Sequence, residues 1–247
     1  MSYLRRVLIT DWPVLAAAVP LHLAGLITMN SFTVESYFFD RQIIWVLISL
    51  IVFFGASFVD WRFLRKSGVV TSVYLGWLTV LLVLLAVGQV TRGAQSWLSF
   101  GGVSLQPADF MKIVLIVVLA KYFSRRHVEI AHIKHIIVSG LYAFIPFLLI
   151  LFQPDFGSAI IIFAIWLGMI IVSGVSKKHL LSVFLIGLAV FSFAWLFLFA
   201  PYQKDRILTF IHPLADIRGA GYNAFQSTIA VGSGQLFGKG LGYGTQS

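Results

Sequence analysis

Long uncharged stretches alternate with short charged ones along most of the chain. Windows without Asp, Glu, Lys or Arg are Trp12–Val34, Gln42–Val59, Ser67–Thr91, His135–Pro154, Phe156–Ser176 and His179–Gln203. Because about 20 apolar residues cover the hydrocarbon core of a bilayer, each window predicts a membrane-spanning helix. We place these helices at residues 12–31, 42–59, 68–90, 135–153, 156–174 and 180–200.

A seventh span is predicted over residues 106–123, although Lys112 and Lys121 interrupt the apolar stretch. Lysine side chains near helix ends can snorkel to the interface or line a cavity. With seven spans and a cytoplasmic N-terminus, 11 of the 18 Lys and Arg residues lie on the inner side and 7 on the outer side. Without the seventh span the division is 9 against 9, so the positive-inside rule favours seven.

The composition agrees with an all-α polytopic membrane protein. Hydrophobic residues make up 59% of the chain, charged residues 11%, and the mean hydropathy is +0.93, which leaves too little charge to cover a soluble domain. The net charge of +9 is scattered among short loops, so no nucleic-acid-binding face is predicted. Arg5 and Arg6 resemble the basic region of a signal peptide, but the apolar window that follows lacks a small-residue cleavage site, which predicts an uncleaved first span.

The chain offers few ligands for a metal ion. It has no cysteine, which excludes disulfides, thiolate metal sites and cysteine nucleophiles. His132 and His135 could share a helix face close to His127, but no third ligand of suitable spacing and no HExxH motif accompanies them. These histidines are therefore interpreted as solvated loop residues.

Polar residues at membrane depth are the first candidates for function, and one group lies between Arg92 and Lys112. Pro107 suits the first turn of a helix, and it places Asp109 near the positive N-terminus, where a carboxylate is favoured. Asp109 and Lys112 are i, i+3 neighbours and can pair. Two interpretations stay open: a neutralising pair that lets the helix insert, or a charged cavity wall at the outer leaflet.

The second candidate is Gln153–Ala159, QPDFGSA, which joins two predicted spans almost without a loop. Its one charged residue, Asp155, is predicted at the outer membrane boundary beside Gly157, where backbones can pack closely. An Asp in such a turn commonly caps the following helix. Capping does not exclude a further role of Asp155 in a site.

The last stretch, Gly219–Ser247, contains eight of the 21 glycines. A glycine-dense polar segment predicts a shaped surface rather than another span, and residues 201–247 are interpreted as the start of an outer loop. The segment is not a phosphate-binding P-loop, because Ser233 stands where the first Gly of that motif should be and Gly240 where Ser or Thr is required.

Four segments together resemble one known family. They are GAQSWL (Gly93–Leu98), LQPADFMK (Leu105–Lys112), QPDFGSA, and GYNAFQSTIAVGSGQLFGKGLGYGTQS at the end of the chain. In order and position they are similar to the signature segments of the SEDS family, the shape, elongation, division and sporulation proteins. The residues of these segments resemble the RodA-like elongation branch more closely than the division branch. The motif residues expected to have structural roles are Trp97, Pro107, Pro154, Gly157, Gly232, Gly234, Gly238 and Gly240.

The resemblance implies a peptidoglycan glycosyltransferase of cell elongation. Such an enzyme polymerises lipid II at the outer face of the bacterial cytoplasmic membrane and contributes to cell shape. Its expected partners are the lipid II substrate, membrane lipids and a class B penicillin-binding protein, which is a transpeptidase. Family members have more spans than the seven predicted here, so the chain resembles roughly their first two thirds.

The resemblance also implies where the catalytic base lies. The family's catalytic aspartate follows the segment that ends here at Ser247, so no catalytic residue is predicted within the chain and these residues alone are expected to be inactive. Three departures bear on the site. Asp109 stands where Glu is common, Ser96 stands where Arg is common, and Gln235 replaces a frequent Gly.

The chemistry assigns roles to the remaining polar residues. Joining sugars from a lipid diphosphate needs a base for the acceptor hydroxyl and cations for the departing diphosphate. We expect Asp109, Lys112, Asp155 and Gln153 to line or brace the substrate cavity, and Arg206, Arg218 and Lys239 to contact the diphosphate. A divalent cation is the alternative source of positive charge.

Two other classes of function remain open. A polytopic chain with intramembrane Asp and Lys also fits a lipid II flippase, although the polar segments gather on the predicted outer side and no inverted repeat relates the halves. A non-catalytic scaffold that recruits a transpeptidase is the third possibility.

Overall fold

The computed structural model describes residues 12–30, 36–87, 89–91, 94–100, 103–124, 133–214, 216–219, 221–235 and 238–240. The chain divides into two compact units, residues 61–199 and residues 1–60 together with 200–247.

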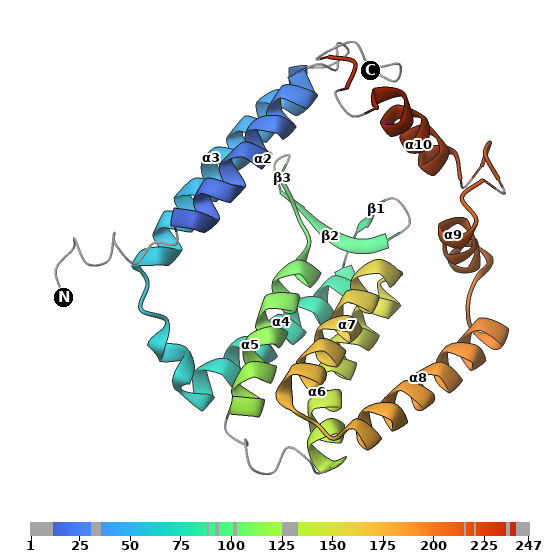
Figure 1. Cartoon of the computed structure of the whole chain (residues 1–247). Helices are drawn as coiled ribbons and strands as arrows, with labels where there is room; N and C mark the ends of the chain where they lie inside the picture. The colour runs from blue at the N-terminus through green and yellow to red at the C-terminus, as the bar shows by residue number, and fades with distance from the viewer. Residues whose placement is uncertain are drawn as a thin grey trace. The chain divides into compact units, whose positions relative to one another are not determined.

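Four helices form the core of the unit 61–199 and lie side by side (Figure 1): α4 (Ser67–Val87), α5 (Pro107–Ser124), α6 (Ile133–Phe152) and α7 (Phe156–Ser173). The short helix η1 (Trp61–Arg65) precedes α4, and α8 (Lys177–Phe197) follows α7. Helix α5 packs against all three of its neighbours. Its buried residues Met111, Leu115 and Leu119 recur at the four-residue spacing of one helix face, so α5 is the central helix of this bundle.

Helices α6 and α7 form a hairpin with a turn of three residues between them. Asp155 caps the start of α7 and Gly174 ends it with a left-handed φ of 86°, a conformation that favours glycine. Farther along the hairpin, a Cβ on Gly140 would lie 3.3 Å from the ring of Trp166, whose indole N–H donates to Ser139 Oγ at 3.1 Å. The two helices therefore approach closely because residue 140 has no side chain.

A small antiparallel sheet, absent from our expectations, connects α4 to α5. It consists of β1 (Gln89–Thr91), β2 (Ala94–Phe100) and β3 (Val103–Leu105), in that spatial order. Leu98 pairs with Leu105 and Phe100 with Val103. Strand β2 contacts both α4 and α5, so the sheet covers one end of the bundle (Figure 1).

The other unit contains a pair of helices that contact each other, α2 (Trp12–Asn30) and α3 (Ser36–Phe58), together with α9 (Pro201–Ile211) and α10 (Tyr222–Gly234). We expected residues 201–247 to form a loop, whereas their described part contains two helices. Helix α9 starts with Pro201 in its first position, where a proline loses no hydrogen bond and its fixed φ suits a helix.

Six helices of the described residues are long and apolar enough to cross a membrane: α2, the part of α3 from Phe39, α4, α6, α7 and α8. Helix α5 carries Asp109, Lys112 and Lys121 in its 18 residues and is the seventh predicted span. Many large apolar side chains of the six helices are exposed, such as Val172 and Leu196, as expected where lipid replaces water. The prediction of an all-α polytopic membrane protein is confirmed.

Candidate functional site at the sheet end of the bundle

We call one end of the α4–α7 bundle the sheet end. There α4 and α6 finish, α5 and α7 begin, and β2 packs against α4 and α5 (Figure 1). The cavity residues predicted from the sequence, Asp109, Lys112, Gln153 and Asp155, all belong to the elements that meet at this end. Asp109 and Gln153, which are 44 positions apart in the sequence, therefore lie at the same end of the bundle.

Asp155 is held by two helices at once. Its Oδ1 accepts from the backbone N–H of Ser158 at 3.1 Å, which is the helix cap. Its Oδ2 accepts from the side-chain amide of Gln106 at 2.5 Å, and the same amide lies 3.4 Å from Ser158 Oγ. Gln106 directly precedes α5, so Asp155 both caps α7 and joins it to the start of α5. The capping expected from the turn sequence is present, with an interhelical bond in addition.

Gln153 forms a second connection between helices. Its side chain is 0% exposed, and its Nε2 donates to the backbone carbonyl of Leu81 in α4 at 2.8 Å. Its Oε1 is buried and has no hydrogen-bond partner. This arrangement costs free energy, because the oxygen has lost its hydrogen bonds to water and has gained no donor in return. Gln153 thus fixes the end of α6 to α4 and keeps one unpaired acceptor at the sheet end.

Asp109 and Lys112 form the ion pair that their spacing predicted. Lys112 Nζ lies 2.7 Å from Asp109 Oδ1, and the side chains are 18% and 60% exposed, respectively. The lysine is therefore the more enclosed partner, and the carboxylate is accessible from outside the bundle. An exposed carboxylate of this kind can exchange its lysine for another cation or a donor on a ligand.

The motif residues around these groups differ in their surroundings. Pro107 is buried at the start of α5, Trp97 is half-buried, and Pro154 is exposed in the turn. We expected close backbone packing at Gly157, but an added Cβ there would meet only Asp155 Oδ1, at an ordinary 3.8 Å. Ser96, which stands where the family commonly has Arg, is 1% exposed, so this position lies inside the packing of β2.

The candidate diphosphate contacts belong to the other unit. Arg206 on α9, Arg218 and Lys239 are all exposed. Arg218 lies in a tight turn, since Asp216 Oδ1 accepts from the N–H of Gly219 at 2.9 Å and Asp216 O accepts from the N–H of Gly221 at 2.9 Å. A Cβ at Gly221 would collide with the carbonyl oxygens of Pro213 and Asp216, so this turn requires glycine.

The four glycines of the C-terminal motif have two kinds of environment. Gly232 and Gly234 belong to α10, and an added Cβ would meet nothing within 4 Å. Gly238 and Gly240 have φ of 74° and 98°, which glycine adopts without strain. Among the described residues, no group of three His, Asp or Glu side chains could hold a metal ion; His127, His132 and residues 241–247 lie outside them. His135 is buried near the start of α6, where its ring contacts the hydroxyl of Tyr122, so the interpretation of this residue as a solvated loop histidine is wrong.

Comparison with known proteins decides the family. The model of the FtsW, RodA and SpoVE family, described as "Cell cycle protein", matches residues 6–247. The chain belongs to the SEDS family. The resemblance found in its four sequence segments is thereby confirmed.

Curated SEDS relatives come from several branches. Stage V sporulation protein E of Bacillus subtilis is 36% identical over 214 residues, which cover 86% of this chain and 58% of that protein. The probable peptidoglycan glycosyltransferase FtsW of Tolumonas auensis is 33% identical and covers 85% and 54%, respectively. The peptidoglycan glycosyltransferase MrdB of Escherichia coli K12 is 36% identical and covers 71% and 49%. The chain thus spans about half the length of these relatives.

Solved structures agree with the SEDS assignment. A chain from a study titled "Structural coordination of polymerization and crosslinking by a peptidoglycan synthase complex" has a TM-score of 0.76 and 28% identity, covering 90% of this chain and 65% of that one. The rod shape-determining protein RodA of Thermus thermophilus has a TM-score of 0.64 and 27% identity, covering 74% and 59%. The helical arrangement of this SEDS chain is therefore that of known membrane proteins.

Sequence reasoning missed Gln106 and Leu81 as parts of the site. Gln106 belongs to the recognised segment LQPADFMK, but nothing in the sequence indicates that its amide bonds a carboxylate 49 residues later. The partner of Gln153 is a backbone carbonyl, which any residue type at position 81 would supply. A contact to a backbone carbonyl therefore cannot be predicted from the type of residue that supplies it.

Proposed function

We propose that the protein acts in cell elongation as a peptidoglycan glycosyltransferase that polymerises lipid II at the outer face of the bacterial cytoplasmic membrane. The observation that carries the proposal is the convergence at the sheet end of Asp155, Gln153 and the Asp109–Lys112 pair, in a family whose relatives are named peptidoglycan glycosyltransferases. The N-terminus is cytoplasmic in this proposal, and the sheet end and the glycine-rich segment face outward.

The residues of the sheet end would position the substrate rather than transfer the proton. Gln106 bonds one carboxylate oxygen of Asp155 and the N-terminus of α7 bonds the other, so this carboxylate braces the end of the bundle. The exposed carboxylate of Asp109 and the ammonium of Lys112 would line the cavity. Arg206, Arg218 and Lys239, or a divalent cation, would offset the charge of the diphosphate, and a carboxylate expected after Ser247 would deprotonate the acceptor hydroxyl.

Two variants of Asp155 separate a role in the site from simple capping. Asn is as good a helix cap as Asp, whereas Ala is not, so Asp155→Asn keeps the cap and loses the charge. In a version completed to the length of its relatives, we expect both Asp155→Ala and Asp155→Asn to lower lipid II polymerisation about a hundredfold, the effect of displacing a positioning group by roughly 1 Å. Full activity of Asp155→Asn would reduce Asp155 to a cap and overturn its role in the site.

The same assay distinguishes an enzyme from a flippase. Labelled lipid II is supplied to the purified, completed protein in detergent, where no membrane has to be crossed. Glycan product supports the glycosyltransferase, whereas turnover that appears only as lipid II crossing a vesicle membrane supports the flippase. Residues 1–247 assayed alone are expected to give no product; polymer from them would contradict the placement of the base after Ser247.

A class B penicillin-binding protein is the proposed partner. The support is the structural match to a chain from a peptidoglycan synthase complex that polymerises and crosslinks. Co-purification of the completed protein with such a transpeptidase, and formation of crosslinked product only when both are present, are the expected results. Equal crosslinking without this protein would argue against the partnership.

A further inference from the structure

Helix α9 carries its apolar and its charged residues on different sides. Successive residues of an α-helix are rotated by about 100° around the axis. At this spacing one side of α9 presents Ile207, Leu208, Phe210 and Ile211. The other side presents Asp205, Arg206 and Thr209. Gln203 and Lys204 share the apolar side only in the first turn, so the helix is amphipathic over most of its length.

Much of the apolar side of α9 is exposed in the part of the protein that the structure describes. Phe210 is 88% exposed, Ile211 59% and Leu208 48%. Directly after the helix, Leu214 and Ile217 are also exposed. Single exposed apolar residues are common on proteins, but several on one side of one helix mark a contact with another apolar surface. The apolar side of α9 therefore requires a partner surface.

Helix α9 is too short and too polar to cross a membrane. Its 11 residues extend over about 16 Å, whereas the hydrocarbon core is about 30 Å thick. It also contains Lys204, Asp205 and Arg206 in succession. An amphipathic helix with these properties is typical of the boundary between lipid headgroups and acyl chains, where its apolar side is buried and its charged side stays in water.

The position of α9 in the chain identifies the partner surface. Helix α8, which directly precedes it, has 21 residues and is long and apolar enough to cross a membrane. A span of that length, about 31 Å, matches the hydrocarbon core, so its ends reach the boundaries of the bilayer. Only residues 198–200 separate α8 from α9, and three residues extend over at most about 11 Å. The start of α9 is thus tethered close to the bilayer boundary.

Local contacts start the helix immediately after this short connection. Pro201 occupies the first helical position, where its fixed φ suits a helix. The backbone N–H of Ala200 donates to the side-chain oxygen of Gln203 at 3.0 Å. Because the chain is already helical at residue 201, no long loop carries α9 away from the end of the span.

We propose that α9 lies in the membrane interface and that the partner of its apolar side is the lipid bilayer itself. Leu208, Phe210 and Ile211 contact the upper part of the acyl chains, and Asp205 and Arg206 face the headgroups and water. The guanidinium of Arg206 suits the phosphates of lipid headgroups. This proposal uses only the polytopic membrane fold and does not depend on the glycosyltransferase proposal.

Spin labels on the two sides of α9 test this placement. The chain has no cysteine, so one introduced cysteine carries the only nitroxide label. Ile211→Cys labels the apolar side and Asp205→Cys the charged side, and both positions are exposed. In phospholipid vesicles, collisions with oxygen report contact with lipid, and collisions with a water-soluble nickel chelate report contact with water.

We expect the ratio of oxygen to nickel collisions to be several-fold higher at position 211 than at position 205, because an interfacial helix buries its apolar side by about 5–10 Å. Equal ratios at the two positions would overturn the proposal. The same rates distinguish other occupants: if protein covers the apolar side, the label at position 211 collides rarely with both reagents, and if water does, it collides mainly with nickel. Either result, in residues 1–247 or in the version completed to the length of its relatives, would overturn the proposal.

A scan along the helix guards against a local disturbance by one label. Single cysteines at each position from 205 to 211 should give an oxygen-to-nickel ratio with a period of about 3.6 residues. The ratio should be highest at Ile207 and Ile211 and lowest at Asp205 and Thr209. A ratio that does not vary with this period would contradict a helix lying along the interface.

Discussion

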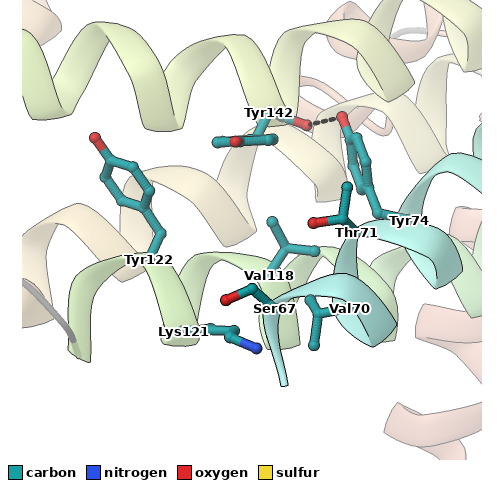
Figure 2. A pocket seen from close by; sticks show the side chains of 8 residues that line it. All are labelled: Ser67, Val70, Thr71, Tyr74, Val118, Lys121, Tyr122 and Tyr142. Carbon is teal, nitrogen blue, oxygen red and sulfur yellow. Dashed lines mark hydrogen bonds between the residues drawn. The ribbon is translucent and has the colours of Figure 1, made fainter. Parts of the chain in front are cut away.

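The two ends of the α4–α7 bundle hold their polar side chains in different ways. At the sheet end, a carboxylate and two amides connect the helices: Asp155 with Gln106, and Gln153 with a carbonyl of α4. At the opposite end, phenol hydroxyls and Lys121 bond backbone carbonyls and a histidine around a cavity. The sheet end exposes the carboxylate of Asp109, whereas tyrosine hydroxyls make the contacts between helices at the opposite end (Figure 2).

This difference bears on the proposed function. An accessible carboxylate can organise cations or hydroxyl groups of a sugar substrate, whereas the hydrogen bonds of the opposite end join α4, α5 and α6 to one another. Changes near the sheet end should therefore alter polymerisation, and changes near the opposite end should alter stability alone.

Gly140→Leu should have the largest effect, because it acts on the packing that both ends share. The Cβ alone would lie 3.3 Å from Trp166, so the longer side chain must separate α6 from α7. Overpacking of this kind costs about 1–3 kcal/mol, seen as a lower thermal midpoint in detergent. Gly168→Leu on α7 is the matched control, since an added Cβ there meets nothing within 4 Å; an equal loss in both variants would contradict the packing argument.

Gln106→Met should weaken the sheet end selectively. It removes the amide that donates to Asp155 and leaves that half-buried carboxylate oxygen with one partner fewer. A hydrogen bond to a charged group contributes about 1.5–3 kcal/mol, so the thermal midpoint and polymerisation by the completed protein should both fall. Unchanged polymerisation at a lowered thermal midpoint would reduce the bond between Gln106 and Asp155 to a structural contact.

Much of the helical fold could be predicted from the sequence, because a bilayer imposes length and apolarity on each span. The pairing of Asp109 with Lys112 and the capping by Asp155 were also predictable, since both depend on residues three positions apart. The bonds of Gln106 to Asp155 and of Tyr74 to Tyr142 were not predictable, because they depend on how separate helices pack. The sheet was missed for another reason: β1 and β3 have only three residues each, and β1 lies inside the uncharged window that also contains α4.

Tyr74→Phe should weaken the opposite end by a smaller amount. The variant keeps the ring edge to face with that of Tyr142 and removes only the hydroxyl that donates to the Tyr142 carbonyl at 2.8 Å. One neutral hydrogen bond contributes about 0.5–1.5 kcal/mol, so we expect a small fall in the thermal midpoint with polymerisation unchanged. Tyr142→Phe is the control, because its backbone carbonyl is retained. A drop in polymerisation by Tyr74→Phe would contradict the independence of the ends.

Lys112→Gln should have the smallest effect on stability and still change activity. Its partner Asp109 is 60% exposed, and exposed ion pairs contribute about 0–1 kcal/mol because water screens them. The thermal midpoint should therefore stay close to that of the unmodified chain, in contrast to Gln106→Met. If Lys112 lines the substrate cavity, polymerisation by the completed protein should nevertheless fall, and the fall should exceed that caused by Lys134→Gln at the other end. Unchanged polymerisation would instead support the other interpretation, in which Asp109 and Lys112 only neutralise each other so that α5 can insert. The sheet-end site would then depend on Asp155 and its bonds to the starts of α5 and α7.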